Sequence, residues 1–228
     1  MPSDLEFIAG NPQSVAPHLD GQTIHLWRIP YALARGRAPL VALLAVYLGV
    51  PEASVVLDQD ARGKPRLAHD ASGRSTSALE FNWSHSGDYA LIALSRGCAM
   101  GVDIERLGKN QRSLEIARRF FDPTEAEALA PLESDARDRA FIDLWCAKEA
   151  VLKAAGEGLS FGLARLAFTH RTDAKWFLAR IDPALGRVGD WRLAGFEAAP
   201  DYRGALAWRG PPLAIAAFRA TGDAGGVC

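Results

Sequence analysis

Segments that favour strands and helices do not alternate along this chain, and that order limits the folds open to it. A doubly wound sheet needs a repeating strand–helix–strand pattern. Here helical patterns gather at 31–48, 113–121 and roughly 133–155. Strand patterns surround them at 22–29, 55–57, 65–67, 89–95, 100–105, 163–169, 176–181, 191–196, 205–208 and 213–219. The sequence therefore predicts an α+β fold.

The helical region carries its own start and stop signals. Asp122-Pro123-Thr124-Glu125 has an N-cap residue, a proline in the first turn and a glutamate at the capping-box position. The long helix ends before Gly156, which fits a left-handed C-terminal cap. We expect Glu125 to have a structural role in this capping box. The segments 69–77 and 222–228 are expected to be a loop and a tail.

Composition excludes several classes of partner. The 228 residues carry a formal charge of −1, which gives no general attraction to nucleic acid or to anionic membranes. The longest apolar run, Pro39 to Val50, is too short to span a bilayer. The three cysteines are far apart and form no C-x-x-C motif. We therefore predict a cytoplasmic protein with reduced thiols that binds neither nucleic acid nor membrane.

One predicted strand places two carboxylates side by side. In Gly101-Val102-Asp103-Ile104-Glu105, the acids are two residues apart and share a face of the strand. Neighbouring carboxylates repel each other unless a cation or a proton lies between them, and Mg²⁺ prefers such oxygen ligands. A short D-x-E motif also arises by chance, with Arg106 neutralising one acid at a solvated strand end. Both interpretations stay open from this strand alone.

The long helix contains two lysines in different settings. Lys148 falls within an apolar arc, where a solvated lysine is not expected. Glu149 and Lys153 lie at the border of that arc, and an ordinary surface pair at this spacing would stabilise the helix by only a few tenths of a kcal/mol. The surface pair explains Glu149 and Lys153 but not Lys148, unless its stem passes Trp145 to reach water.

Two further segments have anion-binding character. In Asn82-Trp83-Ser84-His85-Ser86-Gly87, polar side chains precede a glycine turn, so Ser84, His85 and backbone amides could converge on an anion. Gly63-Lys64-Pro65 holds one of only five lysines in the chain. Each segment by itself is also typical of an ordinary turn.

Taken in order, these segments resemble the surfactin-type (Sfp-like) 4'-phosphopantetheinyl transferases. The resemblance covers about residues 60–160 and rests on five segments with natural spacing. They are Gly63-Lys64-Pro65, Asn82-Trp83-Ser84-His85-Ser86, Gly101-Val102-Asp103-Ile104-Glu105, Arg118-Arg119-Phe120-Phe121 with Glu125, and Trp145-Cys146-Ala147-Lys148-Glu149-Ala150-Val151-Leu152-Lys153.

The resemblance implies an enzyme that moves phosphopantetheine from coenzyme A to a serine of an apo acyl or peptidyl carrier protein, releasing 3',5'-ADP. It assigns Asp103, Glu105 and Glu149 to Mg²⁺, with Mn²⁺ as an alternative. It makes Lys153 a contact of the pyrophosphate and a proton donor to the leaving group, and Glu149 a base for the attacking serine. The coenzyme A contacts that it implies are Lys64, Ser84, His85 and Lys153. Arg28, Arg35 and Arg37 are the available substitutes for absent lysines in the first half, and Arg37 is the candidate among them.

The resemblance also implies the architecture: two similar fused subdomains related by a pseudo-twofold axis, each a small, mostly antiparallel sheet packed with a long helix. We place the N-terminal, coenzyme A-binding subdomain at 1–106 and the C-terminal subdomain, on the metal and carrier side, at 107–228. A fused pair predicts a monomer. The exposed candidates for carrier docking are Arg112, Arg118 and Arg119.

Two other functions use the same residues. A metal-dependent phosphohydrolase of a nucleotide-like substrate would need a water-activating group and no carrier. A non-catalytic coenzyme A-binding module would be expected to lack one of the acids or Lys153, and none is missing.

Overall fold

The computed structural model describes residues 5–60, 63–68, 78–108, 112–170 and 176–220. Its first part contains β1 (Ile8–Gly10), α1 (Pro12–Val15), β2 (Thr23–Pro30), α2 (Ala38–Leu48), β3 (Leu57–Gln59), β4 (Pro65–Leu67), β5 (Leu79–Ser86), β6 (Tyr89–Arg96) and β7 (Met100–Arg106). Then follow α3 (Ser113–Phe120), α4 (Pro123–Leu129), α5 (Ser134–Ala155), β8 (Leu166–His170), β9 (Trp176–Ile181), β10 (Trp191–Ala199), β11 (Tyr202–Arg209) and β12 (Ala214–Ala220).

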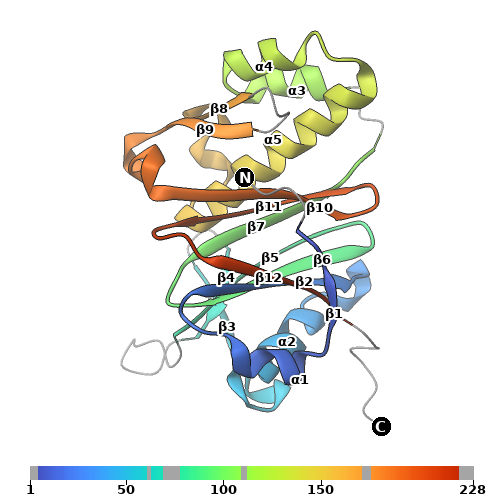
Figure 1. Cartoon of the computed structure of the whole chain (residues 1–228), viewed down its shortest axis with the longest axis vertical. Helices are drawn as coiled ribbons and strands as arrows, with labels where there is room; N and C mark the ends of the chain where they lie inside the picture. Colours follow the sequence, from blue (N-terminus) through green and yellow to red (C-terminus); the bar gives the residue numbers. More distant parts are fainter. Residues whose placement is uncertain (1–4, 61–62, 69–77, 109–111, 171–175, 221–228) are drawn as a thin grey trace.

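The elements form four layers (Figure 1). Helices α1 and α2 lie against a five-stranded sheet with the order β1-β12-β2-β6-β5. The next layer is a three-stranded sheet with the order β10-β11-β7, and α5 packs on its other side. The α+β prediction, with small sheets and helices, is confirmed. The five-stranded sheet is mixed, because β12 is parallel to both of its neighbours.

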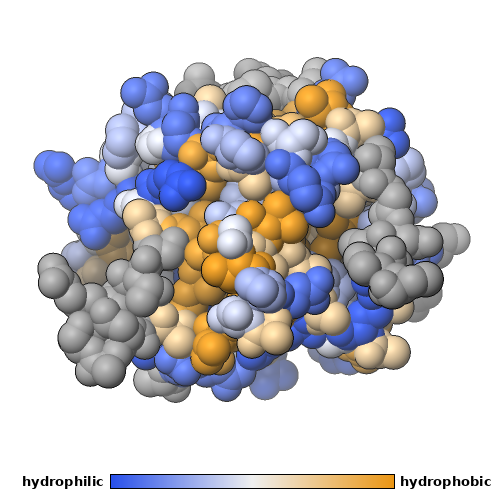
Figure 2. All heavy atoms as spheres, turned by 90° about the horizontal axis from the view of Figure 1, so that it is seen from below, coloured by the Kyte–Doolittle hydropathy of each residue, from blue (hydrophilic) through white to orange (hydrophobic). Residues whose placement is uncertain are grey.

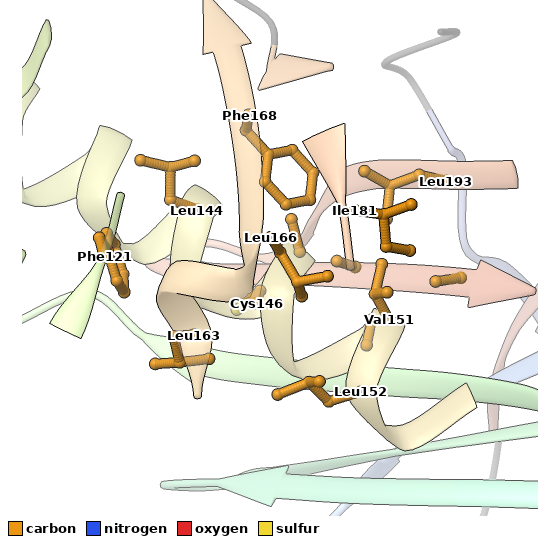
Figure 3. Close-up of a cluster of buried hydrophobic side chains, with 14 of the residues drawn as sticks. Phe121, Leu144, Cys146, Val151, Leu152, Leu163, Leu166, Phe168, Ile181 and Leu193 are labelled. Atoms are coloured by element: carbon orange, nitrogen blue, oxygen red, sulfur yellow. The ribbon is translucent and has the colours of Figure 1, made fainter. Parts of the chain in front are cut away.

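Period-two burial on the strands separates three cores between these layers. On β6, Ile92 faces the helices with Leu44, while Leu91 faces the other sheet and packs with Val102. Beyond the three-stranded sheet, α5 supplies the third core. Figure 3 shows side chains of α5 beside those of β8, including Leu144, Val151, Leu152, Leu166 and Phe168.

Two strands tie the halves of the chain together. β7 pairs with β11, with Asp103 opposite Ala205, although β7 belongs to the first half of the sequence. β12, near the end of the chain, lies between β1 and β2. Each half therefore contributes a strand to a sheet made mainly by the other, and the division at 1–106 and 107–228 stays a prediction.

Several predicted boundaries were wrong. The helix expected over 31–48 begins at Ala38, because Gly36 has φ +50° and the first helical turn contains Pro39. The strand expected at 163–169 begins at Leu166, after a short 3₁₀ turn. Residues 82–86 lie on an eight-residue strand, β5, which the sequence pattern did not predict, and the glycine turn at Gly87 follows it. The loop and tail expected at 69–77 and 222–228 lie outside the described residues.

The helix α2 carries no charged side chain. Figure 2, which views the molecule from the side of α1 and α2, shows apolar side chains gathered on that face. Within the described ranges, no helix combines the length and the apolar character needed to cross a bilayer.

Candidate active site

The candidate site forms where α5 crosses β7. Gly101, Asp103 and Glu105 share one face of the strand, and that face is turned toward the helix. A Cβ atom at Gly101 would lie 2.1 Å from the carbonyl oxygen of Ala150 and 2.5 Å from the backbone nitrogen of Ala154. The glycine therefore permits the close approach that brings Glu149 and Lys153 of α5 over the carboxylates.

Asp103 and Lys153 form the centre of the site. The Lys153 Nζ donates to Asp103 Oδ1 at 2.7 Å, to Ser84 Oγ at 3.0 Å and to the carbonyl oxygen of Val102 at 3.1 Å. These three bonds use all three ammonium protons. Asp103 is 4% exposed, so its charge depends on this lysine for compensation.

Polar side chains from β5 hold β7, although the two strands belong to different sheets. The Asn82 Oδ1 accepts from the backbone nitrogen of Val102 at 2.7 Å. The Ser84 Oγ donates to Asp103 Oδ1 at 2.8 Å, and the Ser86 Oγ donates to Glu105 Oε2 at 2.9 Å. Three alternate residues of β5 thus bind the backbone of β7 at Val102 and the side chains of Asp103 and Glu105. Sequence reasoning missed the roles of Asn82 and Ser86, although their period-two spacing matches that of the acids.

Two buried carboxylate oxygens, Asp103 Oδ2 and Glu149 Oε1, have no hydrogen-bond partner. Burial, followed by the charge of Asp103, raises the pKa of Glu149 to about 7. Burial and the charge of Asp103 also raise the pKa of Glu105. The raised pKa values indicate that Asp103, Glu105 and Glu149 repel one another and that Lys153 neutralises their negative charge only in part.

The donor set fits a hard divalent cation, because all of its atoms are carboxylate oxygens and two of them lack partners. The three predicted ligands are not gathered into a ready-made cluster. Among the described residues, no group of three His, Cys, Asp or Glu side chains is arranged to hold a metal ion.

The predicted coenzyme A contacts lie in different settings. The Lys64 Nζ donates to the carbonyl oxygen of Lys153 at 2.7 Å, near the C-terminal end of α5, and burial lowers the pKa of this lysine. A cavity of about 360 Å³ adjoins it, between β4, β5 and the end of α5. His85 is exposed and stacks on Tyr31, with ring centroids 4.5 Å apart. Arg37 precedes α2, and no contact with the carboxylates is seen for it among the described residues.

Lys148 has a structural environment. Both Lys148 and Glu125 have fully buried side chains, and the Lys148 Nζ lies 2.8 Å from Glu125 Oε2. The lysine also donates to the carbonyl oxygens of Leu163 and Leu166. The predicted capping box is confirmed, because Glu125 accepts from the backbone nitrogen of Asp122. The sequence did not reveal that Glu125 also binds Lys148, which belongs to another helix.

Comparisons with known proteins define the class. A family model described as the 4'-phosphopantetheinyl transferase superfamily matches residues 99–207, and one described as 4'-phosphopantetheinyl transferase, N-terminal, matches residues 32–96. The 4'-phosphopantetheinyl transferase HetI of Nostoc is 34% identical over 73% of this chain and 72% of its own. The human L-aminoadipate-semialdehyde dehydrogenase-phosphopantetheinyl transferase is 34% identical over 60% of this chain and 46% of its own.

This chain belongs to the 4'-phosphopantetheinyl transferase family. It is a transferase that moves 4'-phosphopantetheine from coenzyme A to a serine of a carrier protein. Family membership favours this activity over the phosphohydrolase and the non-catalytic binding module. Among solved structures, a holo-ACP synthase from Plasmodium yoelii aligns with 50% of this chain and 94% of its own, at 16% identity and a TM-score of 0.37.

Proposed function

We propose that Asp103, Glu105 and Glu149 bind Mg²⁺, or Mn²⁺ in its place, together with the pyrophosphate of coenzyme A. The observation that carries this assignment is the pair of buried, unpartnered oxygens on Asp103 and Glu149. When bound, the cation would supply Lewis-acid polarisation and charge neutralisation at the phosphate groups. The assignment to the surfactin type within the family is supported by the sequence resemblance, and these three acids belong to the segments that carry it.

Lys153 would contact the pyrophosphate and donate a proton to the departing 3',5'-ADP. Its ammonium group lies beside Asp103 and its side chain is 25% exposed, so Lys153 could contact both the carboxylates and a bound anion. Since its three protons are already bonded within the protein, phosphate binding would exchange at least one of these bonds. Ser84 would keep Asp103 oriented during that exchange.

Glu149 would accept the proton of the attacking carrier serine. In the metal-free protein its pKa of about 7 leaves the carboxyl near half-protonation at neutral pH, and a bound cation would favour the deprotonated, proton-accepting form. The serine oxygen would then form a bond to the β-phosphorus while the bond to the 3',5'-ADP oxygen breaks. Positioning and charge neutralisation contribute most to such a displacement.

The 3'-phosphate end of coenzyme A would bind at Lys64, His85 and Ser84, with Arg37 as a further contact. The cavity beside Lys64 supports this placement for Lys64. Ser84 serves the carboxylate cluster in the structure, so its contact with the nucleotide would be shared with Asp103.

The carrier would be an apo acyl or peptidyl carrier protein, docking near Arg112, Arg118 and Arg119. The last two lie in the final turn of α3, beside the exposed side chain of Phe120. A monomeric state and a cytoplasmic location remain part of the proposal. Sedimentation analysis and cell fractionation would measure them.

Intact-protein mass spectrometry of apo carrier proteins from fatty acid, polyketide and nonribosomal peptide synthesis would test this proposal. The carrier should gain one phosphopantetheine unit in the presence of coenzyme A and Mg²⁺. EDTA or the Glu149→Ala substitution should abolish the gain, and Mn²⁺ should restore activity after EDTA. Full activity in excess EDTA would remove the metal from the proposal, and full activity of the variant would remove Glu149.

A further inference from the structure

A tyrosine from the second half of the chain anchors the turn that follows His85. Tyr202 is 3% exposed. Its hydroxyl accepts from the backbone nitrogen of Asp88 at 3.0 Å and donates to Asp88 Oδ2 at 3.2 Å. Gly87 has φ +53°, and a Cβ atom there would lie 2.4 Å from the Tyr202 hydroxyl oxygen. The hydroxyl therefore occupies the space that a side chain at position 87 would fill.

The turn that Tyr202 anchors also positions Tyr31, whose ring supports His85. The backbone nitrogen of Tyr31 donates to the carbonyl oxygen of Asp88 at 2.8 Å. The Tyr31 ring then stacks on His85 with an interplanar angle of 24°. Because His85 is otherwise exposed, this stack and the adjacent Trp83 ring set its orientation. The position of the His85 imidazole thus depends on the turn that Tyr202 binds.

Tyr202 is itself fixed to the strand that carries the carboxylates. It lies opposite Arg106 in the pairing of β11 with β7, directly after the irregular residue Asp201 with φ +62°. The guanidinium of Arg106 lies over its ring, 5.7 Å from the centroid, and Tyr89 packs edge-on at 5.0 Å. Tyr202 therefore connects the sheet of Asp103 and Glu105 to the turn beside His85.

We propose that Tyr202 is a positioning residue that acts through the turn at Gly87 and Asp88 to place His85 for recognition of the 3'-phosphate of coenzyme A. This inference rests on the role assigned to His85 in the proposed function. Within the described part of the chain, no hydrogen bond is seen between the Tyr202 hydroxyl and Asp103 or Glu105. Tyr202 would set the spacing between His85, which would bind the 3'-phosphate of coenzyme A, and the sheet that carries the carboxylates, which would bind its pyrophosphate through the cation.

The test compares coenzyme A with dephospho-coenzyme A, which lacks only the 3'-phosphate. Tyr202→Phe removes the hydroxyl and keeps the ring on Tyr89 and Arg106. Calorimetric titration with Mg²⁺ present should show about tenfold weaker binding of coenzyme A, the size of effect expected from losing one hydrogen bond. Binding of dephospho-coenzyme A should be unchanged. In kinetics, KM for coenzyme A should rise while kcat stays within about twofold of the original enzyme.

Tyr47→Phe is the matched control. Its hydroxyl also makes two hydrogen bonds, to His25 and Trp27, in the core between the five-stranded sheet and the helices. Thermal melts of both variants would show that each is folded at the assay temperature. The control should bind both nucleotides like the original protein, whatever its loss of stability.

Two results would overturn the role of Tyr202: equal weakening of both nucleotides by Tyr202→Phe, which indicates a general structural effect, or no change for either. His85→Ala separates these from a failure of the proposed function. If His85→Ala loses affinity for coenzyme A selectively and Tyr202→Phe does not, only the positioning inference fails. If His85→Ala shows no selectivity for the 3'-phosphate, the assignment of His85 fails and the inference falls with it. In the His85→Ala background, Tyr202→Phe should add no further loss.

Discussion

The helix α5 carries two lysines five residues apart, and their surroundings differ in how completely charge is satisfied. Lys148 lies in a closed pair with Glu125, where Glu125 also accepts from the backbone nitrogens of Asp122 and Phe168. Lys153 lies beside carboxylates with two oxygens that have no partner.

Burial alone therefore does not mark a functional charge. A buried ion pair whose hydrogen-bonding groups are all satisfied fixes the packing of neighbouring elements. A buried cluster with unsatisfied oxygens retains the capacity to bind a cation or a proton. The first arrangement joins α4, α5 and β8, and the second forms the candidate active site.

The largest effect should come from removing a charge from the carboxylates beside Lys153, where two oxygens have no partner. Asp103→Asn keeps the shape of the side chain but loses the charge that Lys153 and the cation would share. We expect transfer to fall roughly a thousandfold, equivalent to a loss of several kcal/mol of transition-state stabilisation. Carrier modification followed by mass spectrometry gives the rate, and circular dichroism checks the fold. A variant with nearly full activity would show that Asp103 lies outside the metal site.

A change in the buried Lys148–Glu125 pair should mainly affect the stability of the fold. Lys148→Met leaves the Glu125 carboxylate buried without its cation, which should cost about 3–5 kcal/mol of unfolding free energy. Urea denaturation measures this loss.

The double variant Lys148→Met/Glu125→Gln should recover part of that stability, since no buried charge remains unpaired. Activity per folded molecule should stay close to that of the original protein in both variants. A large loss of activity with unchanged stability would place Lys148 in the reaction and contradict the comparison.

The raised pKa of Glu149 should also make the unfolding free energy of the metal-free protein depend on pH. The pKa of Glu149, about 7, lies above its ordinary value of 4.5, so the folded protein binds more protons than the unfolded chain between these values. Stability from this group is present below pH 4.5 and is lost as pH rises through 7. Without metal, the loss should be on the order of 2–3 kcal/mol at most.

Urea denaturation in EDTA from pH 4.5 to 8 measures this change, and Glu149→Gln supplies the reference. The variant should lack this component of the pH dependence. Identical pH profiles for the two proteins would mean that the pKa of Glu149 is the same in the folded and unfolded states. Added Mg²⁺ should raise the melting temperature more at pH 8 than at pH 6, because ligand carboxylates bind cations when deprotonated.

The smallest effect should come from the exposed charge next to the closed pair. Arg180 contacts Asp122 Oδ2 at 2.6 Å, but its side chain is 54% exposed. Arg180→Ala should therefore change the unfolding free energy by less than about 1 kcal/mol and leave transfer unaffected. A loss as large as that of Lys148→Met would show that the comparison between buried and exposed pairs does not hold here.

Much of the local structure followed from local patterns. The capping box at Asp122 and Glu125, the end of α5 at Gly156 and the shared face of Asp103 and Glu105 all depend on neighbours within a few residues. The start of α2 was harder to predict, because the pattern before Ala38 continues through a short 3₁₀ helix at Leu33–Arg35, which Gly36 with φ +50° separates from the α-helix.

The site was predicted in part. The sequence singled out Ser84, Asp103, Glu149 and Lys153, which the fold brings to one place. Their functional roles stay proposals. The contact of Ser86 with Glu105 was not predicted, because β5 and β7 lie in different sheets and no local pattern states that they meet.

The sequence by itself determined the α+β class, the main helices and strands, and the residues that resemble the transferase family. Those features depend on periodicity, capping and short motifs, which are local properties of the chain. Only the tertiary structure decided which lysine is neutralised, which carboxylate oxygens lack partners, and which tyrosine supports the turn after His85. These are properties of burial and of contacts between residues as far apart as Asp88 and Tyr202, and they exist only in the folded chain.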